Sequence, residues 1–173
     1  RVLAIVALII AFSRPQTGVT GETVNADGID IVLAIDVSSS MLAEDLEPNR
    51  LEAAKAVAAE FVEGRRNDRI GLVVFAGEAF TQVPLTLDYS AVTELLGQME
   101  VGMIEDGTAV GMGLATAVKR LQASDAESQV VVLLTDGRSN TGEIGPVTAG
   151  QMAQALGVRV YSIGAGSQGM ARM

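Results

Sequence analysis

Histidine, cysteine and tryptophan are missing from this sequence of 173 residues. Without histidine and cysteine, the chain cannot form a Ser-His-Asp or Cys-His catalytic group, and it lacks the ligands of ordinary zinc, haem and iron–sulfur sites. No disulfide can form either, so the cysteine content leaves the redox compartment open. Any metal ion bound by this chain is therefore expected to be a hard cation with oxygen ligands.

Basic residues are also scarce. The chain has 12 lysines and arginines against 21 acidic residues, for a net charge of −9, and its lysines are Lys55 and Lys119. Binding to nucleic acid requires clustered basic side chains that neutralise phosphates, so this composition argues against a nucleic-acid partner. An acidic surface of this kind favours cations or a basic protein surface instead.

Polar residues are absent from Val2–Phe12, a run of 11 apolar residues. As a helix this run is about 16 Å long, roughly half of the 30 Å hydrocarbon core of a bilayer. We interpret residues 1–14 as part of a transmembrane helix, residues 15–28 as a linker and residues 29–173 as a folded domain. A buried element and a signal-peptide core are the alternatives, although a signal peptide needs a starting Met and a basic leader.

From residue 29 onward, β-branched runs of strand length alternate with Ala-rich segments of helical spacing. This alternation predicts an α/β fold with a Rossmann-like, doubly wound and mainly parallel sheet. Pro84 indicates one antiparallel edge strand. The expected strands are Asp30–Asp36, Arg69–Phe75, Phe80–Leu85, Gln129–Thr135 and Arg159–Gly164. The expected helices span residues 50–63, 88–99, 108–121 and 146–156.

Oxygen-bearing side chains follow two of these strands. Asp36 ends the first strand, with Ser38 and Ser40 in the loop behind it, and Asp136 follows the strand QVVVLLT. If the two strands are neighbours, the two carboxylates lie close together and need a cation or a shared proton. Thr108, at the start of the helix before QVVVLLT, is a further oxygen donor.

These five oxygen donors suit Mg²⁺, which prefers octahedral oxygen coordination and keeps several waters; Mn²⁺ and Ca²⁺ are the alternatives. Each residue also has an ordinary structural role. Serines fill turns after strands, Thr108 is a suitable helix N-cap and Asp-Gly is a common turn. Their combination on one edge of the predicted sheet favours a metal site.

The segments DVSSS, DGTAVG and LLTDG resemble the metal-ion-dependent adhesion site of von Willebrand factor type A domains. Asp36, Ser38 and Ser40 match its Asp-x-Ser-x-Ser element, Thr108 matches its isolated threonine and Asp136 its second aspartate. The resemblance implies that a carboxylate of a partner protein fills the open position on the metal ion. It therefore implies protein binding rather than catalysis.

Over residues 1–166 the chain is similar to membrane-anchored bacterial proteins of the Bat, or aerotolerance, type; the segments GIDIVLAIDVSSSM and DRIGLVVFAGEAFTQVPLTLDY carry this resemblance. The resemblance implies an inner-membrane protein with a periplasmic domain and a role in envelope stress tolerance or complex assembly. Such proteins continue with another strand, helix and membrane segment. The chain is therefore expected to be truncated at its C-terminus and to lack the last strand and helix.

One enzyme class stays open as the alternative: a Mg²⁺-dependent, phosphatase-like hydrolase with Asp36 as nucleophile. Such enzymes need a second acidic group two residues further on, and this position holds Ser38. We therefore expect a protein that is not an enzyme.

Acidic residues surround the predicted site, and we call them the acidic rim. A partner that supplies a carboxylate is expected to be basic around it, because association is otherwise slowed by repulsion. Met41 and Met103 border the site and are candidates for partner contact. The acidic rim consists of Glu44, Asp45, Glu47, Glu105, Asp106 and Glu143. The basic residues near the site are Arg50 and Arg138.

Overall fold

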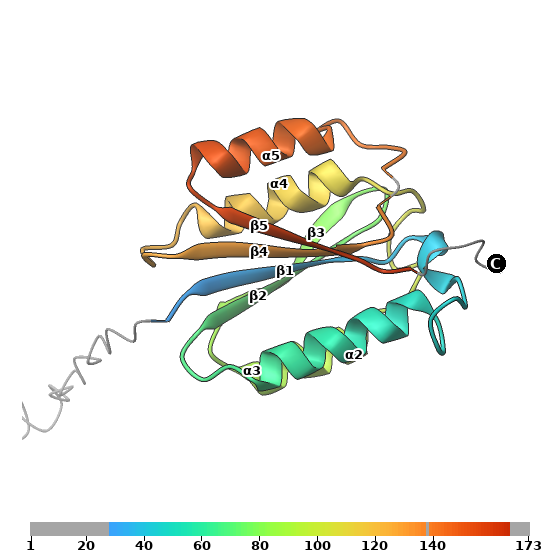
Figure 1. Cartoon of the computed structure of the whole chain (residues 1–173), viewed down its shortest axis with the longest axis horizontal. Helices are drawn as coiled ribbons and strands as arrows, with labels where there is room; N and C mark the ends of the chain where they lie inside the picture. Colours follow the sequence, from blue (N-terminus) through green and yellow to red (C-terminus); the bar gives the residue numbers. More distant parts are fainter. Residues whose placement is uncertain (1–27, 138, 167–173) are drawn as a thin grey trace, which may run out of the picture.

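A computed structural model describes residues 28–137 and 139–166. Its five-stranded sheet has the order β3-β2-β1-β4-β5 (Figure 1). β1 pairs in parallel with β2 and β4, β4 pairs in parallel with β5, and β3 lies antiparallel to β2 at one edge. The predicted fold class is confirmed. The strands are β1 (Asp30–Asp36), β2 (Arg69–Phe75), β3 (Ala79–Thr86), β4 (Gln129–Thr135) and β5 (Arg159–Gly164).

Helices cover both faces of the sheet. α2 and α3 lie on one face and α4 and α5 on the other, as Figure 1 shows. The helices are α2 (Arg50–Glu63), α3 (Tyr89–Gly97), α4 (Val110–Leu121) and α5 (Pro146–Ala155), with a short 3₁₀ helix, η1 (Ser39–Leu42). Side chains of a strand alternate between the faces, so a strand covered on both sides is apolar throughout. In β1, Ile31 and Leu33 pack in the core under α2, whereas Val32 and Ala34 pack under α4.

The helix boundaries follow local capping. Asn49 caps α2 by accepting a hydrogen bond from the backbone N–H of Glu52, as its sequence position predicts. α4 begins at Val110, two residues later than predicted. The reason is tertiary: the N–H of Thr108 donates to Asn140 Oδ1 at 2.9 Å, and its carbonyl accepts from the Asn140 N–H at 3.0 Å. These contacts hold Thr108 outside the helix.

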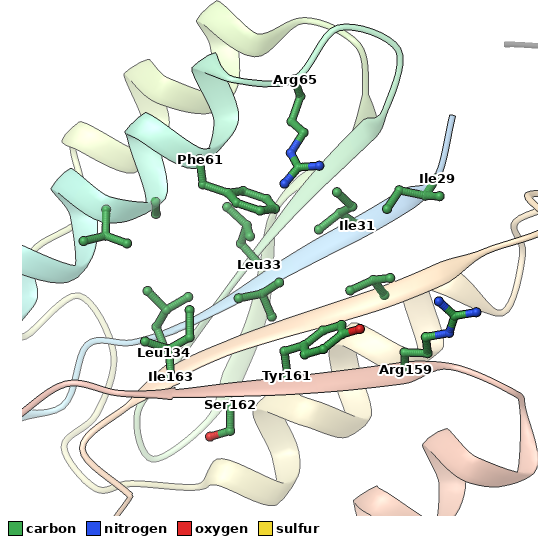
Figure 2. A pocket seen from close by; sticks show the side chains of 14 residues that line it. Ile29, Ile31, Leu33, Phe61, Arg65, Leu134, Arg159, Tyr161, Ser162 and Ile163 are labelled. Carbon is green, nitrogen blue, oxygen red and sulfur yellow. The ribbon is translucent and has the colours of Figure 1, made fainter. Parts of the chain in front are cut away.

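An apolar groove of about 480 Å³ lies between α2 and β5. In Figure 2, Phe61 comes from α2, Leu33 from β1, and Tyr161 and Ile163 from β5. Tyr161 and Ile163 are 56% and 45% exposed. All six residues of β5, the last strand of the described sheet, are exposed. The edge of the sheet that β5 forms is thus much less covered than the central strands.

Two predictions concern residues outside the described ranges. The transmembrane interpretation of residues 1–14 and nearly all of the linker fall within residues 1–27. Across residues 28–137 and 139–166, no helix combines the length and the apolar character needed to cross a membrane. The expected truncation at the C-terminus likewise concerns no residue that the structure describes and stays a prediction.

Candidate metal centre

The two strands that carry the aspartates lie side by side. β1 and β4 pair in parallel, with Ile35 opposite Leu134, so both strands end at the same edge of the sheet. At that edge, the hydroxyl of Thr135 donates a 2.7 Å hydrogen bond to Oδ2 of Asp36. Asp36 is completely buried, and the side chain of Asp136 is 3% exposed. The predicted neighbourhood of the two strands is therefore present in the structure.

The loop after β1 folds back over the strand end. The backbone N–H of Ser38 donates to Oδ1 of Asp36 at 3.0 Å, and η1 begins at the next residue. This turn brings the hydroxyls of Ser38 and Ser40 to 3.0 Å from each other. Ser38 is buried and Ser40 is partly exposed. The Asp-x-Ser-x-Ser element thus gathers a carboxylate and two hydroxyls in one turn.

Thr108 lies in the loop before α4, and this loop contacts both neighbouring loops. Asp106 accepts hydrogen bonds from the N–H and the hydroxyl of Ser39, at 3.1 and 2.8 Å. On its other side, Thr108 is joined to Asn140, in the loop after β4, by its backbone hydrogen bonds. Thr108 is 3% exposed. The structure therefore places its loop between those that carry the serines and Asp136.

Burial raises the pKa of Asp36, while hydrogen bonds from Ser38 and Thr135 act in the opposite direction. The negative charge of Asp136 raises the pKa further, so the two carboxylates are close enough to repel each other. A cation near both carboxylates would offset the cost of burying the charge of Asp36 and the repulsion between the two negative charges. The sequence positions of the two aspartates alone predicted this need for a cation.

The donor set fits a hard divalent cation. It combines two carboxylates with three hydroxyls, the ligand types that Mg²⁺, Mn²⁺ and Ca²⁺ accept. Within the described ranges, no group of three or more His, Cys, Asp or Glu side chains is gathered as a metal site. A metal ion would therefore depend on the hydroxyls of Ser38, Ser40 and Thr108 to complete its coordination.

Arg50 and Asp45 were predicted to lie near the site, but their pairing was not predicted. Arg50 donates to both oxygens of Asp45, at 2.7 and 3.0 Å, and to Oδ2 of Asp136 at 3.1 Å. Arg50 is the first residue of α2, where the helix dipole disfavours a positive charge. That unfavourable position is the sequence signal that could have indicated a specific role.

Two further residues were missed or misplaced. Thr135 was read only as a strand residue, yet its hydroxyl holds Asp36. Met41 was expected to contact a partner, which is wrong, because it is completely buried in the core under α2. Met103 is 49% exposed, and its proposed contact stays a prediction.

The acidic rim is only partly free of internal contacts. Asp45 and Asp106 bind Arg50 and Ser39, respectively. Arg138 lies outside the described residues. The other members of the acidic rim, Glu44, Glu47, Glu105 and Glu143, are exposed.

Comparisons with known proteins show the family of this chain. Residues 30–173 match the model of the von Willebrand factor type A domain. A protein of Borreliella burgdorferi is 36% identical over 166 residues, covering 95% of this chain and 49% of that protein. The chain spans about half the length of the curated relatives it matches.

Two solved structures are informative. An aerotolerance-related membrane protein from Bacteroides fragilis is 34% identical, with a TM-score of 0.75, over 84% of this chain and 77% of that one. Proximal thread matrix protein 1 from the mussel byssus has a zinc-occupied metal-ion-dependent adhesion site (MIDAS) motif. It is 28% identical, with a TM-score of 0.65, over 79% of this chain and 35% of that one.

Proposed function

Because the chain belongs to the von Willebrand factor type A family, we propose that it is a metal-dependent protein-binding module. The main supporting observation is the turn that gathers Asp36, Ser38 and Ser40 at the end of β1, beside the end of the paired strand β4 that Asp136 follows. In this proposal Asp36, Ser38, Ser40, Thr108 and Asp136 hold a divalent cation, with Mg²⁺ as the first candidate and Mn²⁺ or Ca²⁺ as alternatives. The zinc-occupied motif of the mussel protein supports a divalent ion in such a site.

The ion supplies an open position for a carboxylate of the partner protein. The chain's own residues prepare this position. Thr135 and the Ser38 N–H orient the buried carboxylate of Asp36. The contact of Asp106 with Ser39 joins the loop that carries Thr108 to the loop that carries Ser38 and Ser40. These hydrogen bonds keep the oxygen donors in place, so little ordering remains to be done when an ion or a partner binds.

The partner is proposed to be basic around its carboxylate. A polar cavity of about 600 Å³ lies beside Gly107, in the loop that carries Thr108, and is lined by Glu78, Thr141 and Glu143. The exposed acidic residues of this cavity would attract lysine and arginine side chains and repel an acidic surface. Binding is therefore expected to weaken as ionic strength rises.

We further propose that the module is anchored by its N-terminal apolar run in a bacterial inner membrane and faces the periplasm, where it acts in envelope stress tolerance or complex assembly. The support is the apolar run Val2–Phe12 and the likeness to a protein described as an aerotolerance-related membrane protein. None of the three relatives named above carries an enzymatic name. Ser38 also occupies the position where a phosphatase of the aspartate type needs an acidic group, which weighs against the enzyme alternative.

Metal binding is tested by thermal unfolding of the full chain in chelator and in MgCl₂, MnCl₂ or CaCl₂. An ion at 100 times its dissociation constant stabilises the fold by about 2.7 kcal/mol, which corresponds to a rise in Tm of about 5–10 °C. Asp36→Asn and Asp136→Asn should abolish the rise. Glu127→Gln, an exposed residue before β4, should retain it. If none of the three cations moves the wild-type curve, the metal site is refuted.

Partner binding is tested by a pull-down with the full-length membrane form, with and without chelator. A partner that is lost in chelator and in Asp136→Asn would support the proposal. A partner that stays bound in both would contradict metal-dependent binding, even if the ion itself binds.

A further inference from the structure

Arg50 connects two loops around the candidate metal centre, those that carry Asp45 and Asp136. Its guanidinium binds both carboxylate oxygens of Asp45 and one oxygen of Asp136, a residue 86 positions away in the chain. A Cβ atom added to Gly166, beyond β5, would lie 3.4–3.5 Å from the guanidinium. The Arg50 side chain is only 13% exposed. A positive charge is thus held beside a candidate metal ligand by hydrogen bonds to two carboxylates.

The position of this charge is set mainly by Asp45. The two hydrogen bonds to Asp45 form a bidentate pair, a strong arrangement of an arginine with a carboxylate. The single hydrogen bond to Asp136 is the longest of the three, at 3.1 Å. Asp45 therefore orients the Arg50 side chain. This orientation places the positive charge of Arg50 beside Asp136.

We propose that Arg50 is an internal counter-cation of Asp136 that lowers the affinity of the centre for its divalent ion. This inference depends on the proposed function, because it concerns the regulation of the same site. The physical reason is Coulombic: Arg50 offsets part of the charge of Asp136 and repels an ion that approaches the same carboxylate. The centre then fills only at a higher ion concentration than its two aspartates would otherwise require.

Loss of the Arg50 charge should raise the affinity for the divalent ion, a direction of change that structural damage would not produce. Loss of a residue that merely orients a ligand weakens metal binding, typically by about 10- to 100-fold. Loss of a repelling charge strengthens it. Arg50→Gln removes the charge, whereas Arg50→Lys keeps it, so the two variants separate charge from side-chain identity.

The experiment is isothermal titration of the full chain with MgCl₂ after treatment with chelator. Arg50→Gln should bind Mg²⁺ about 5- to 10-fold more tightly than wild type, the order expected for one unit charge acting on a divalent ion in a hydrated site. Arg50→Lys should stay within about twofold of wild type, because the charge is kept. Arg66→Gln, an exposed arginine just beyond α2, removes the same charge from the surface and should also stay within about twofold.

Circular dichroism checks that each variant is folded. If Arg50→Gln does not fold, Asp45→Asn provides the test with the opposite sign: it leaves the charge of Arg50 less compensated and should weaken Mg²⁺ binding. Unchanged or weaker binding by folded Arg50→Gln, while wild type binds Mg²⁺, overturns the inference and leaves the metal site standing. Absence of binding by wild type and every variant refutes the metal site itself, and the inference with it.

Discussion

Gly111, in the first turn of α4, is expected to tolerate no side chain. A Cβ atom built there would lie 2.0 Å from the carbonyl oxygen of Ile144 and 2.7 Å from the carbonyl carbon of Gly145. These are backbone atoms of the turn before α5, so a rotamer change cannot relieve the clash. Even a tight 3.0 Å contact would require α4 and this turn to separate by about 1 Å.

Two opposing effects set the magnitude for Gly111→Ala. Replacing a helical glycine by alanine favours the helix by about 1 kcal/mol. Forcing packed segments apart typically costs about 1–3 kcal/mol, and more where backbone must move. Gly150, inside α5, is the matched control, because a Cβ there meets nothing within 4 Å. Gly150→Ala should therefore stabilise the fold by about 0.5–1 kcal/mol.

The assay is urea unfolding of wild type and both variants, followed by circular dichroism and supported by thermal scans. Gly111→Ala should be less stable than Gly150→Ala by about 2–4 kcal/mol, which corresponds to a Tm difference of about 5–15 °C. Equal stability of the two variants would refute the close approach of α4 to the turn before α5. A loss of stability in Gly150→Ala would refute the open space around that residue.

Two other predictions concern hydrogen bonds around the candidate metal centre. Thr135→Val should destabilise the fold by about 1.5–3 kcal/mol in urea unfolding, because the buried carboxylate of Asp36 loses its 2.7 Å hydroxyl donor. Thr135→Ser should recover most of this loss, and an unchanged unfolding midpoint for the valine variant would contradict the role. The backbone N–H and hydroxyl of Ser39 lower the pKa of Asp106, so the contact stabilises the fold above the unfolded-state pKa and is lost as pH falls through the folded-state pKa. Ser39→Ala should raise the pKa of Asp106 in an NMR titration; an unchanged pKa would show that the hydroxyl contributes nothing.

The elements of the fold could be predicted because they depend on local patterns. β1, β2, β4 and β5 have the bounds predicted from their β-branched runs, and Asn49 caps α2 as predicted. The start of α4 could not be predicted from the sequence around it. Thr108 has a good capping side chain, but Asn140 binds its backbone groups, and Asn140 is 32 residues away.

The candidate metal centre was partly predictable for a similar reason. In a parallel sheet, the carboxyl ends of neighbouring strands share one edge, so Asp36 and Asp136 could be placed together once their strands were assumed to be neighbours. The contacts of Arg50 were not predictable, because several acidic residues compete for one guanidinium. Met41 was misjudged because its position near the site says nothing about which way its side chain points.

The sequence alone determined which atoms this protein offers for chemistry: oxygen donors at the ends of strands, no histidine or cysteine, and an excess of negative charge. Residue type and short-range periodicity carry this information. Only the tertiary structure decided that β1 and β4 are neighbours, that Thr135 donates to Asp36, and that Arg50 places its positive charge beside Asp136. These features join segments far apart in the chain, and packing and charge pairing select them only when the whole domain folds.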